Sequence, residues 1–157
     1  MKSSPIDPRS HDLFHHIDLL LKSFKHWTGR DLLTPLPTLP QTAHARFEIP
    51  FIVLSHGAEQ DPILNYGNRA ALELWEMTWD SFIHTPSRLT AEPLSREARA
   101  RFLTEVTQKG FIDNYGGVRI SNTGKRFQIE GAVVWNIIDE RGAYQGQAAT
   151  FEKWFYL

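Results

Sequence analysis

The chain has 157 residues, 41% of them hydrophobic, and a formal net charge of −1, so it is long enough for one folded domain and has no basic surplus for binding nucleic acid. It contains no cysteine, which excludes disulfides, thiolate metal sites and cysteinyl cofactors. No apolar run approaches the ~20 residues of a membrane helix, and the polar N-terminus lacks a signal core; we therefore expect a cytoplasmic protein that binds neither membrane nor nucleic acid.

An amphipathic helix is the first predicted element and lies within residues 1–34. Apolar side chains recur at spacings of four and three between Leu13 and Trp27, which places them on one seam. Ser10 suits the N-cap and Gly29 suits the end of this helix. The seam either docks on the rest of the domain or forms a short coiled-coil-like dimer contact, since two heptads are too few to decide.

Residues 35–50 contain four prolines and are predicted to be an extended connector. The segment FIVLSH, residues 51–56, is typical of a buried strand, and residues 63–66 of a second short strand. Asn68 suits the N-cap of a short helix, and a further helical segment is expected to begin at Thr78 or Asp80. One face of the predicted helical region consists of Ala71, Leu74, Trp75 and Thr78.

A longer helix is predicted from an N-cap at Ser95 to a C-terminal Gly110. Its apolar face consists of Ala98, Phe102 and Val106. Arg96, Arg99 and Arg101 are interpreted as a solvated outer face.

The last third of the chain has β character. Strands are predicted at residues 115–120, 125–139 and 144–155, with turns between them. In the second of these strands alternate positions are apolar, and Gly131 interrupts the row, which consists of Phe127, Ile129, Val133, Trp135 and Ile137. The complete order predicts an α+β fold, a five-stranded antiparallel sheet with short helices on one face, preceded by an N-terminal helix.

This order resembles the PAS fold, and six sequence blocks resemble the MEKHLA domain, a PAS-like family. The blocks are FIVLSHG, DPILNYGNRAALELWEMTW, PSRLTAEP, GFIDNYGGVRISNTGKRF, VVWNIID and GQAATFEKW. The family occurs as free-standing bacterial proteins, many of them cyanobacterial, and at the C-terminus of plant class III homeodomain–leucine zipper proteins. The resemblance covers about residues 47–157 and extends, less distinctly, to the N-terminal helix. We expect residues 51–157 to be the PAS-like domain, behind the helix of residues 1–34 and the connector of residues 35–50.

The resemblance implies a cavity between sheet and helices that holds a flavin, haem, a small metabolite or nothing. Flavin attachment to cysteine is excluded because the chain has none. Haem-binding relatives often use a histidine on the long helix, and residues 95–109 contain none, which argues against haem. The cofactor, if there is one, is left open.

Nine residues are candidates for lining such a pocket. Arg88 is expected beside its mouth by resemblance, where it either pairs with an acid such as Glu73 or meets an anionic ligand group. The small Ala148 and Ala149 would leave room at mid-sheet. The large aromatic residues either fill the core or enclose a ligand. The candidates are His56, Asn65, Trp75, Trp79, Phe82, Arg88, Arg119, Phe127 and Trp135.

No catalytic or metal site is predicted. The sequence has no Walker loop and no GxGxxG after a strand. His11 and His15 are four residues apart, but we interpret them as part of a solvated helix face. Ser55 and His56 are adjacent on a strand and therefore point to opposite faces, so they do not form a nucleophile–base pair.

The favoured interpretation is a non-enzymatic sensory or regulatory domain that binds a small ligand or a protein partner. We expect a homodimer that signals to a separate protein effector. The alternatives are an interaction module with a filled core, and a small enzyme with a pocket-bound substrate near His56 or His84.

Overall fold

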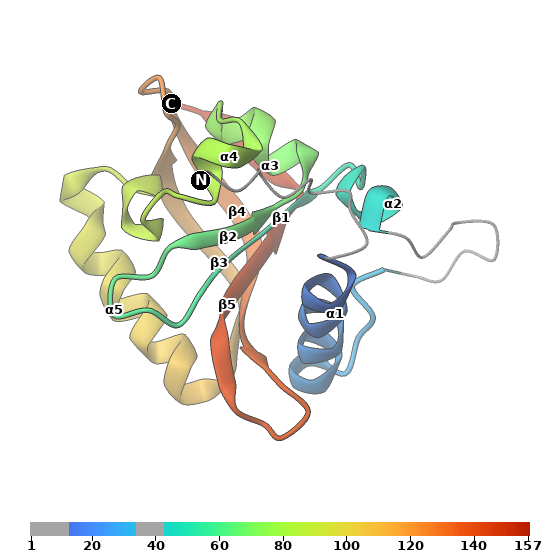
Figure 1. Cartoon of the computed structure of the whole chain (residues 1–157). Coiled ribbons are helices and arrows are strands. Elements are labelled where there is room, and N and C mark those ends of the chain that lie inside the picture. The colour runs from blue at the N-terminus through green and yellow to red at the C-terminus, as the bar shows by residue number, and fades with distance from the viewer. Residues whose placement is uncertain (1–12, 34–42) are drawn as a thin grey trace, which may run out of the picture.

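The computed structural model describes residues 13–33 and 43–157, and an antiparallel sheet forms its centre (Figure 1). The strands lie side by side in the order β2–β1–β5–β4–β3, and the short β6 pairs with β4. The strands are β1 (Ile52–His56), β2 (Leu64–Gly67), β3 (Phe111–Ile120), β4 (Arg126–Ile138), β5 (Tyr144–Phe151) and β6 (Lys153–Tyr156). The helices are α1 (Phe14–Thr28), α2 (Ala43–Phe47), α3 (Arg69–Trp75), α4 (Trp79–Phe82), the 3₁₀ turn η2 (Ser87–Thr90) and α5 (Pro93–Lys109). The predicted α+β fold is confirmed, with β6 as an addition because Glu152 interrupts the single strand expected over residues 144–155.

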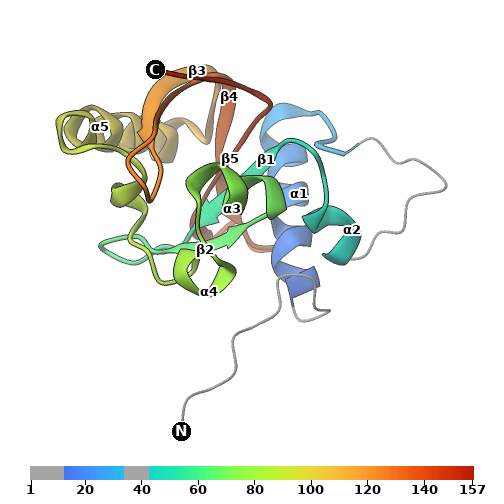
Figure 2. The ribbon, with the colours of Figure 1, turned by 90° about the horizontal axis from the view of Figure 1, so that it is seen from above.

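Helix α1 lies on one face of the sheet, while α5 and α3 lie on the other side (Figures 1 and 2). Ile17, Leu20 and Phe24 of α1 are buried in a core cluster that also contains Trp135 of β4. The seam therefore docks on the domain, one of the two alternatives that the sequence left open. Gly29 ends the helix as predicted, with a left-handed φ of 72°, whereas the predicted N-cap Ser10 lies outside the described residues.

Three local predictions were wrong. Residues 43–47 form α2 inside the range expected to be an extended connector. Helix α5 begins at Pro93, two residues before the predicted cap Ser95, because proline suits the first position of a helix, where its missing N–H costs nothing. Ala98, expected on the buried face, is exposed.

Asn68 caps α3 as predicted and also ties it to the sheet. Its Oδ1 accepts hydrogen bonds from the N–H groups of Ala71 and Val53, at 3.2 and 3.1 Å. Its Nδ2 donates to the carbonyls of Ile49 and Phe51, at 3.3 and 2.7 Å. A fully buried amide thus satisfies all its hydrogen-bonding capacity through the backbone of two separate segments.

A bulge in β4 changes the face of the sheet to which alternate side chains point, so residues before and after it contribute to different core clusters. Gly117 pairs with Ile129 and Tyr115 with Ala132, so three steps along β4 match two along β3 and one residue is extra. Gly131, with a φ of 65°, stands in this step. Phe127, Ile129 and Ala132 consequently share one core cluster, whereas Val133, Trp135 and Ile137 belong to the cluster beneath α1. The predicted row of alternating residues on a single face was therefore wrong beyond Gly131.

Candidate functional site

A small cavity lies between the sheet and α5, with a volume of about 60 Å³. Its walls are mainly apolar, and its lining includes residues from β1, β3, β4, β5, η2 and α5. The lining residues are Leu54, Ser55, His56, Leu64, Trp75, Ser87, Thr90, Arg99, Phe102, Leu103, Tyr115, Arg119, Ile129, Ala132, Val134, Gln147, Ala148, Ala149 and Phe151.

The floor of the cavity follows from the register of β1, β5 and β4. Leu54 pairs with Ala149, and Ala149 pairs with Val134, so these three form one row across the sheet. His56, Gln147 and Asn136 form the next row in the same way. Because paired residues in a sheet point to the same face, an apolar row and a polar row lie next to each other.

The polar row fastens α5 to the sheet. Asn136 Nδ2 donates to the carbonyls of Val106 and Thr107, each at 3.1 Å. Gln147 Nε2 donates to the carbonyl of Leu103 at 3.0 Å and to Asn136 Oδ1 at 3.1 Å. The Val106 carbonyl also accepts from the N–H of Gly110, so these amides add to the hydrogen bonds of the last two turns of α5 and join them to the sheet.

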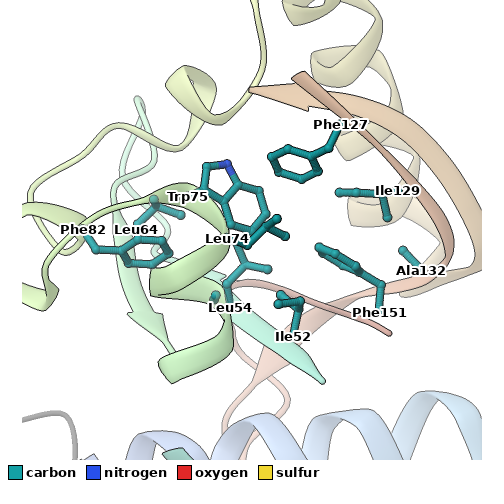
Figure 3. Close-up of a cluster of buried hydrophobic side chains, with 11 residues drawn as sticks. Ile52, Leu54, Leu64, Leu74, Trp75, Phe82, Phe127, Ile129, Ala132 and Phe151 are labelled. Carbon is teal, nitrogen blue, oxygen red and sulfur yellow. The ribbon is translucent and has the colours of Figure 1, made fainter. Parts of the chain in front are cut away.

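An aromatic cluster adjoins the cavity at Trp75, and Figure 3 shows the Trp75 side chain beside the other apolar side chains of this cluster. The Trp75 ring meets the rings of Phe127 and Phe151 edge-on, at centroid distances of 5.2 and 6.2 Å. Across the cavity, Phe102 and Tyr115 stack at 3.7 Å. Trp75 Nε1 is buried and has no hydrogen-bond partner among the described residues.

His56 presents an unpaired nitrogen. The side chain is buried, and its Nδ1 lies 3.0 Å from the carbonyl oxygen of Gly57, to which it donates. Burial lowers the pKa of His56, so the ring is neutral near pH 7 and Nε2 is an acceptor. No described group meets good hydrogen-bond geometry with this Nε2, although the Gln147 side chain lies near enough to the ring to oppose the lowering of its pKa.

Two arginines lie at the cavity without an acidic partner. Arg99 donates from Nη2 to Ser87 Oγ at 2.6 Å, and Arg119 donates from Nη1 to the carbonyl of Val118 at 2.8 Å and from Nη2 to the Tyr115 hydroxyl at 3.1 Å. Within residues 13–33 and 43–157 no carboxylate forms an ion pair with either guanidinium. Burial, and then the charge of Arg119, lower the pKa of Arg99 to about 10, so Arg99 remains cationic near neutral pH.

On the opposite face of the sheet, Ser55 forms a contact that the sequence did not suggest. Its Oγ donates to Asn65 Oδ1 at 2.5 Å and lies 3.0 Å from His16 Nε2 on α1. A hydroxyl has one proton, so His16 must donate Nε2–H to Ser55 and is not placed to accept the serine proton. Ser55 and His56 do point to opposite faces, as predicted.

The profile of the MEKHLA domain matches residues 14–156 of the chain. The chain belongs to this family. The matched range includes α1, to which the resemblance also extended, although residues 51–157 alone were expected to form the PAS-like domain.

Relatives of this MEKHLA domain include much longer plant proteins. The rice (Oryza sativa subsp. indica) homeobox-leucine zipper protein HOX32 is 24% identical over 157 residues, which cover 99% of this chain and 18% of the rice protein. The Arabidopsis thaliana protein ATHB-9 is 23% identical over 96 residues, covering 61% of this chain and 11% of that protein. The chain thus spans less than a fifth of the length of these relatives.

Solved structures support the PAS fold. A PAS domain from Colwellia psychrerythraea superposes with a TM-score of 0.60 at 16% identity, covering 69% of this chain and 89% of that one. A light-oxygen-voltage domain studied with a flavin analogue gives 0.55 at 12% identity, covering 71% and 80%.

The structure separates the nine candidate residues into four groups. His56, Trp75 and Arg119 line the cavity. Phe82 and Phe127 lie in the adjoining core cluster rather than at the cavity. Trp79 and Trp135 belong to the cluster on the α1 side, and Asn65 bonds to Ser55 on that same side. Arg88 is exposed and pairs with Asp61 at 3.3 Å, not with Glu73.

Arg99 and Gln147 of the MEKHLA domain are cavity residues that sequence reasoning missed. Arg99 was assigned to the solvated face of its helix. It precedes Phe102 by three residues and Val106 by seven, which places all three on one side of a helix, so the spacing contained the signal. Gln147 likewise alternates with Ala149 and Phe151 on β5.

The described residues contain no group of three or more His, Cys, Asp or Glu side chains arranged to hold a metal ion. Of the helices in the described ranges, none combines the length and the apolar character needed to cross a bilayer.

Proposed function

We propose that this MEKHLA domain is a non-enzymatic sensory or regulatory domain that binds a small molecule in the cavity between the sheet and α5. The observation that carries the proposal is the set of unpaired polar groups there: His56 Nε2, Trp75 Nε1 and two guanidiniums without acids. A buried polar atom without a partner costs about 1–3 kcal/mol. A ligand that pairs with these groups would offset that cost.

The setting of the family supports a regulatory role. In its plant relatives the matching segment is under a fifth of a longer homeobox-leucine zipper protein. A ligand that alters the contact between α5 and the sheet would change the surface offered to a separate protein effector or to a second copy of the domain.

Native mass spectrometry of protein purified without denaturation tests this proposal. We expect a bound small molecule that is lost on denaturation. Ala149→Leu adds side-chain volume to the cavity wall and should remove the bound mass, whereas Ala98→Leu, on the exposed face of α5, should retain it. If the wild type carries no bound mass, and gains none on incubation with a mixture of small metabolites, the ligand-binding function is wrong.

A protein-interaction module is the second candidate, because apolar side chains are exposed at the end of the chain. Phe155, Tyr156 and Leu157 are 48%, 59% and 60% exposed. A concentration-dependent dimer in sedimentation velocity that is abolished by Phe155→Ser with Tyr156→Ser would favour this function. A monomer at every concentration, with no partner retained, would contradict it.

A further inference from the structure

We propose that the ligand of the cavity is a short aliphatic carboxylate held by Arg99 and Arg119. This inference rests on the proposed ligand-binding function and names the chemical class of the ligand.

The charge distribution around the cavity indicates an anion. Five arginines at the surface are paired with acids: Arg30 with Asp113, Arg69 with Glu48, Arg88 with Asp61, Arg101 with Glu97 and Arg126 with Glu92. Arg96 donates to the carbonyl of Ala91 instead. The two arginines of the cavity have only hydroxyl and carbonyl acceptors. A partly desolvated guanidinium is costly without a counter-charge, so the cavity lacks one negative group that a ligand would supply.

The two arginines also act on each other. The positive charge of Arg119 opposes the protonated form of Arg99, and no carboxylate is among the cavity-lining residues. An anion that meets both groups would replace this repulsion with two charge-assisted hydrogen-bonding interactions. A carboxylate is the natural match, because its two oxygens fit the planar fork of a guanidinium.

The volume and the apolar walls of the cavity restrict the ligand to small carboxylates. The volume is about 60 Å³, well below the roughly 150 Å³ cavity that accommodates benzene. Leu54, Ile129 and Phe151 present apolar surface to the same space. A small carboxylate with a short alkyl chain places its charge at the arginines and its chain against these residues.

Isothermal titration calorimetry with sodium propionate, on the extensively dialysed chain of 157 residues, tests the inference. We expect propionate to bind the wild type and to bind Arg99→Gln and Arg119→Gln at least about tenfold more weakly. Propionamide, which has nearly the same shape but no charge, should bind the wild type at least about tenfold more weakly than propionate. Arg101→Gln is the matched control, because Arg101 is on the same helix but exposed, and it should leave the affinity unchanged.

A measurement on the wild type alone covers the case in which an arginine variant does not fold. In ¹H–¹⁵N spectra of the side chains, propionate should shift the Nε–Hε signals of Arg99 and Arg119 and leave that of Arg101 in place. Unshifted signals for the two cavity arginines at saturating propionate would overturn the proposal.

The outcomes separate this inference from the ligand-binding function. If propionamide binds as tightly as propionate, recognition of charge is wrong while ligand binding stands. If acetate, propionate and butyrate all fail to bind the wild type, the carboxylate class is wrong, and the native mass spectrum then decides the ligand-binding function independently.

Discussion

Replacing Phe24 by alanine tests the docking of α1 on the sheet. Phe24 is 4% exposed and meets the Trp135 ring edge-on at a centroid distance of 5.0 Å. Burial of an aromatic side chain of ~200 Å² is worth up to ~5 kcal/mol at ~25 cal/mol per Å², and measured Phe→Ala changes in cores cost about 3–5 kcal/mol. We therefore expect Phe24→Ala to lower the free energy of unfolding by about 3–4 kcal/mol.

Urea denaturation followed by tryptophan fluorescence and far-UV circular dichroism measures this loss. With a urea m-value of roughly 2 kcal/mol per M, the unfolding midpoint should fall by about 1.5–2 M. Because the seam is covered within one chain, the loss should be the same at two protein concentrations that differ about a hundredfold. Phe155→Ala is the matched control, since Phe155 is 48% exposed, and it should change stability by less than about 0.5 kcal/mol.

Two results would refute the reasoning. A loss for Phe24→Ala as small as that for Phe155→Ala would mean that the ring is not part of the core. A loss that vanishes on dilution would mean that the seam of α1 serves a contact between chains.

Three further predictions concern pH, a buried amide and a glycine. Burial, reinforced by the charge of the neighbouring histidine, lowers the pKa of His16 to about 4, below the ~6.5 of an unfolded histidine. The contribution of His16 to stability is therefore complete above about pH 6.5, is lost as the pH falls towards 4, and reaches ~3 kcal/mol. Urea midpoints between pH 7 and 4.5 should consequently fall less in His16→Gln than in the wild type. Asn68→Ala leaves four backbone groups without their partner and should lower the free energy of unfolding by at least about 3 kcal/mol, as read from urea midpoints. Gly110→Ala combines a φ of 94° with a Cβ only 2.4 Å from the ring of Trp27, and its melting temperature should fall by at least about 5 °C.

Each of these has a control and a result that would count against it. The prediction for His16 fails if the wild type and His16→Gln lose stability in parallel on acidification. Asn122→Ala, an exposed amide, should be nearly neutral, and an equal loss in both asparagine variants would argue against the role of Asn68. Gly124→Ala has a similar φ of 90° but nothing within 4 Å of its Cβ, so a loss equal to that of Gly110→Ala would show that backbone strain alone accounts for the effect.

Features set by a few neighbouring residues could be predicted from the sequence. The capping of α3 by Asn68 and the ends of α1 and α5 at Gly29 and Gly110 depend on local backbone geometry. The α1 seam and the order of helices and strands along the chain followed from periodicity and from the resemblance to the MEKHLA domain. These features define the fold and the layer in which a ligand would lie.

The face on which each side chain lies could not be predicted as well. Trp135 was placed between sheet and helices, but the extra residue at Gly131 turns it to the α1 side, and a bulge depends on how the partner strand pairs. Arg99 was misplaced for a different reason. Its charge suggested a solvent-exposed side chain, although its spacing of three residues from Phe102 indicated the buried face of the helix. Arg88 pairs with Asp61, 27 residues away along the chain, a contact that no local pattern indicates.

The step at Gly131 makes β4 more sensitive to changes in length than to changes in side chain. Deleting this one residue would move every side chain from Ala132 to Ile138 to the opposite face of the sheet. Trp135 would then project into the space now occupied by the amide of Asn136, and that amide would meet apolar side chains of α1. Among MEKHLA sequences, insertions and deletions should therefore be rare between Ile129 and Ile138, while substitutions that preserve size remain common there.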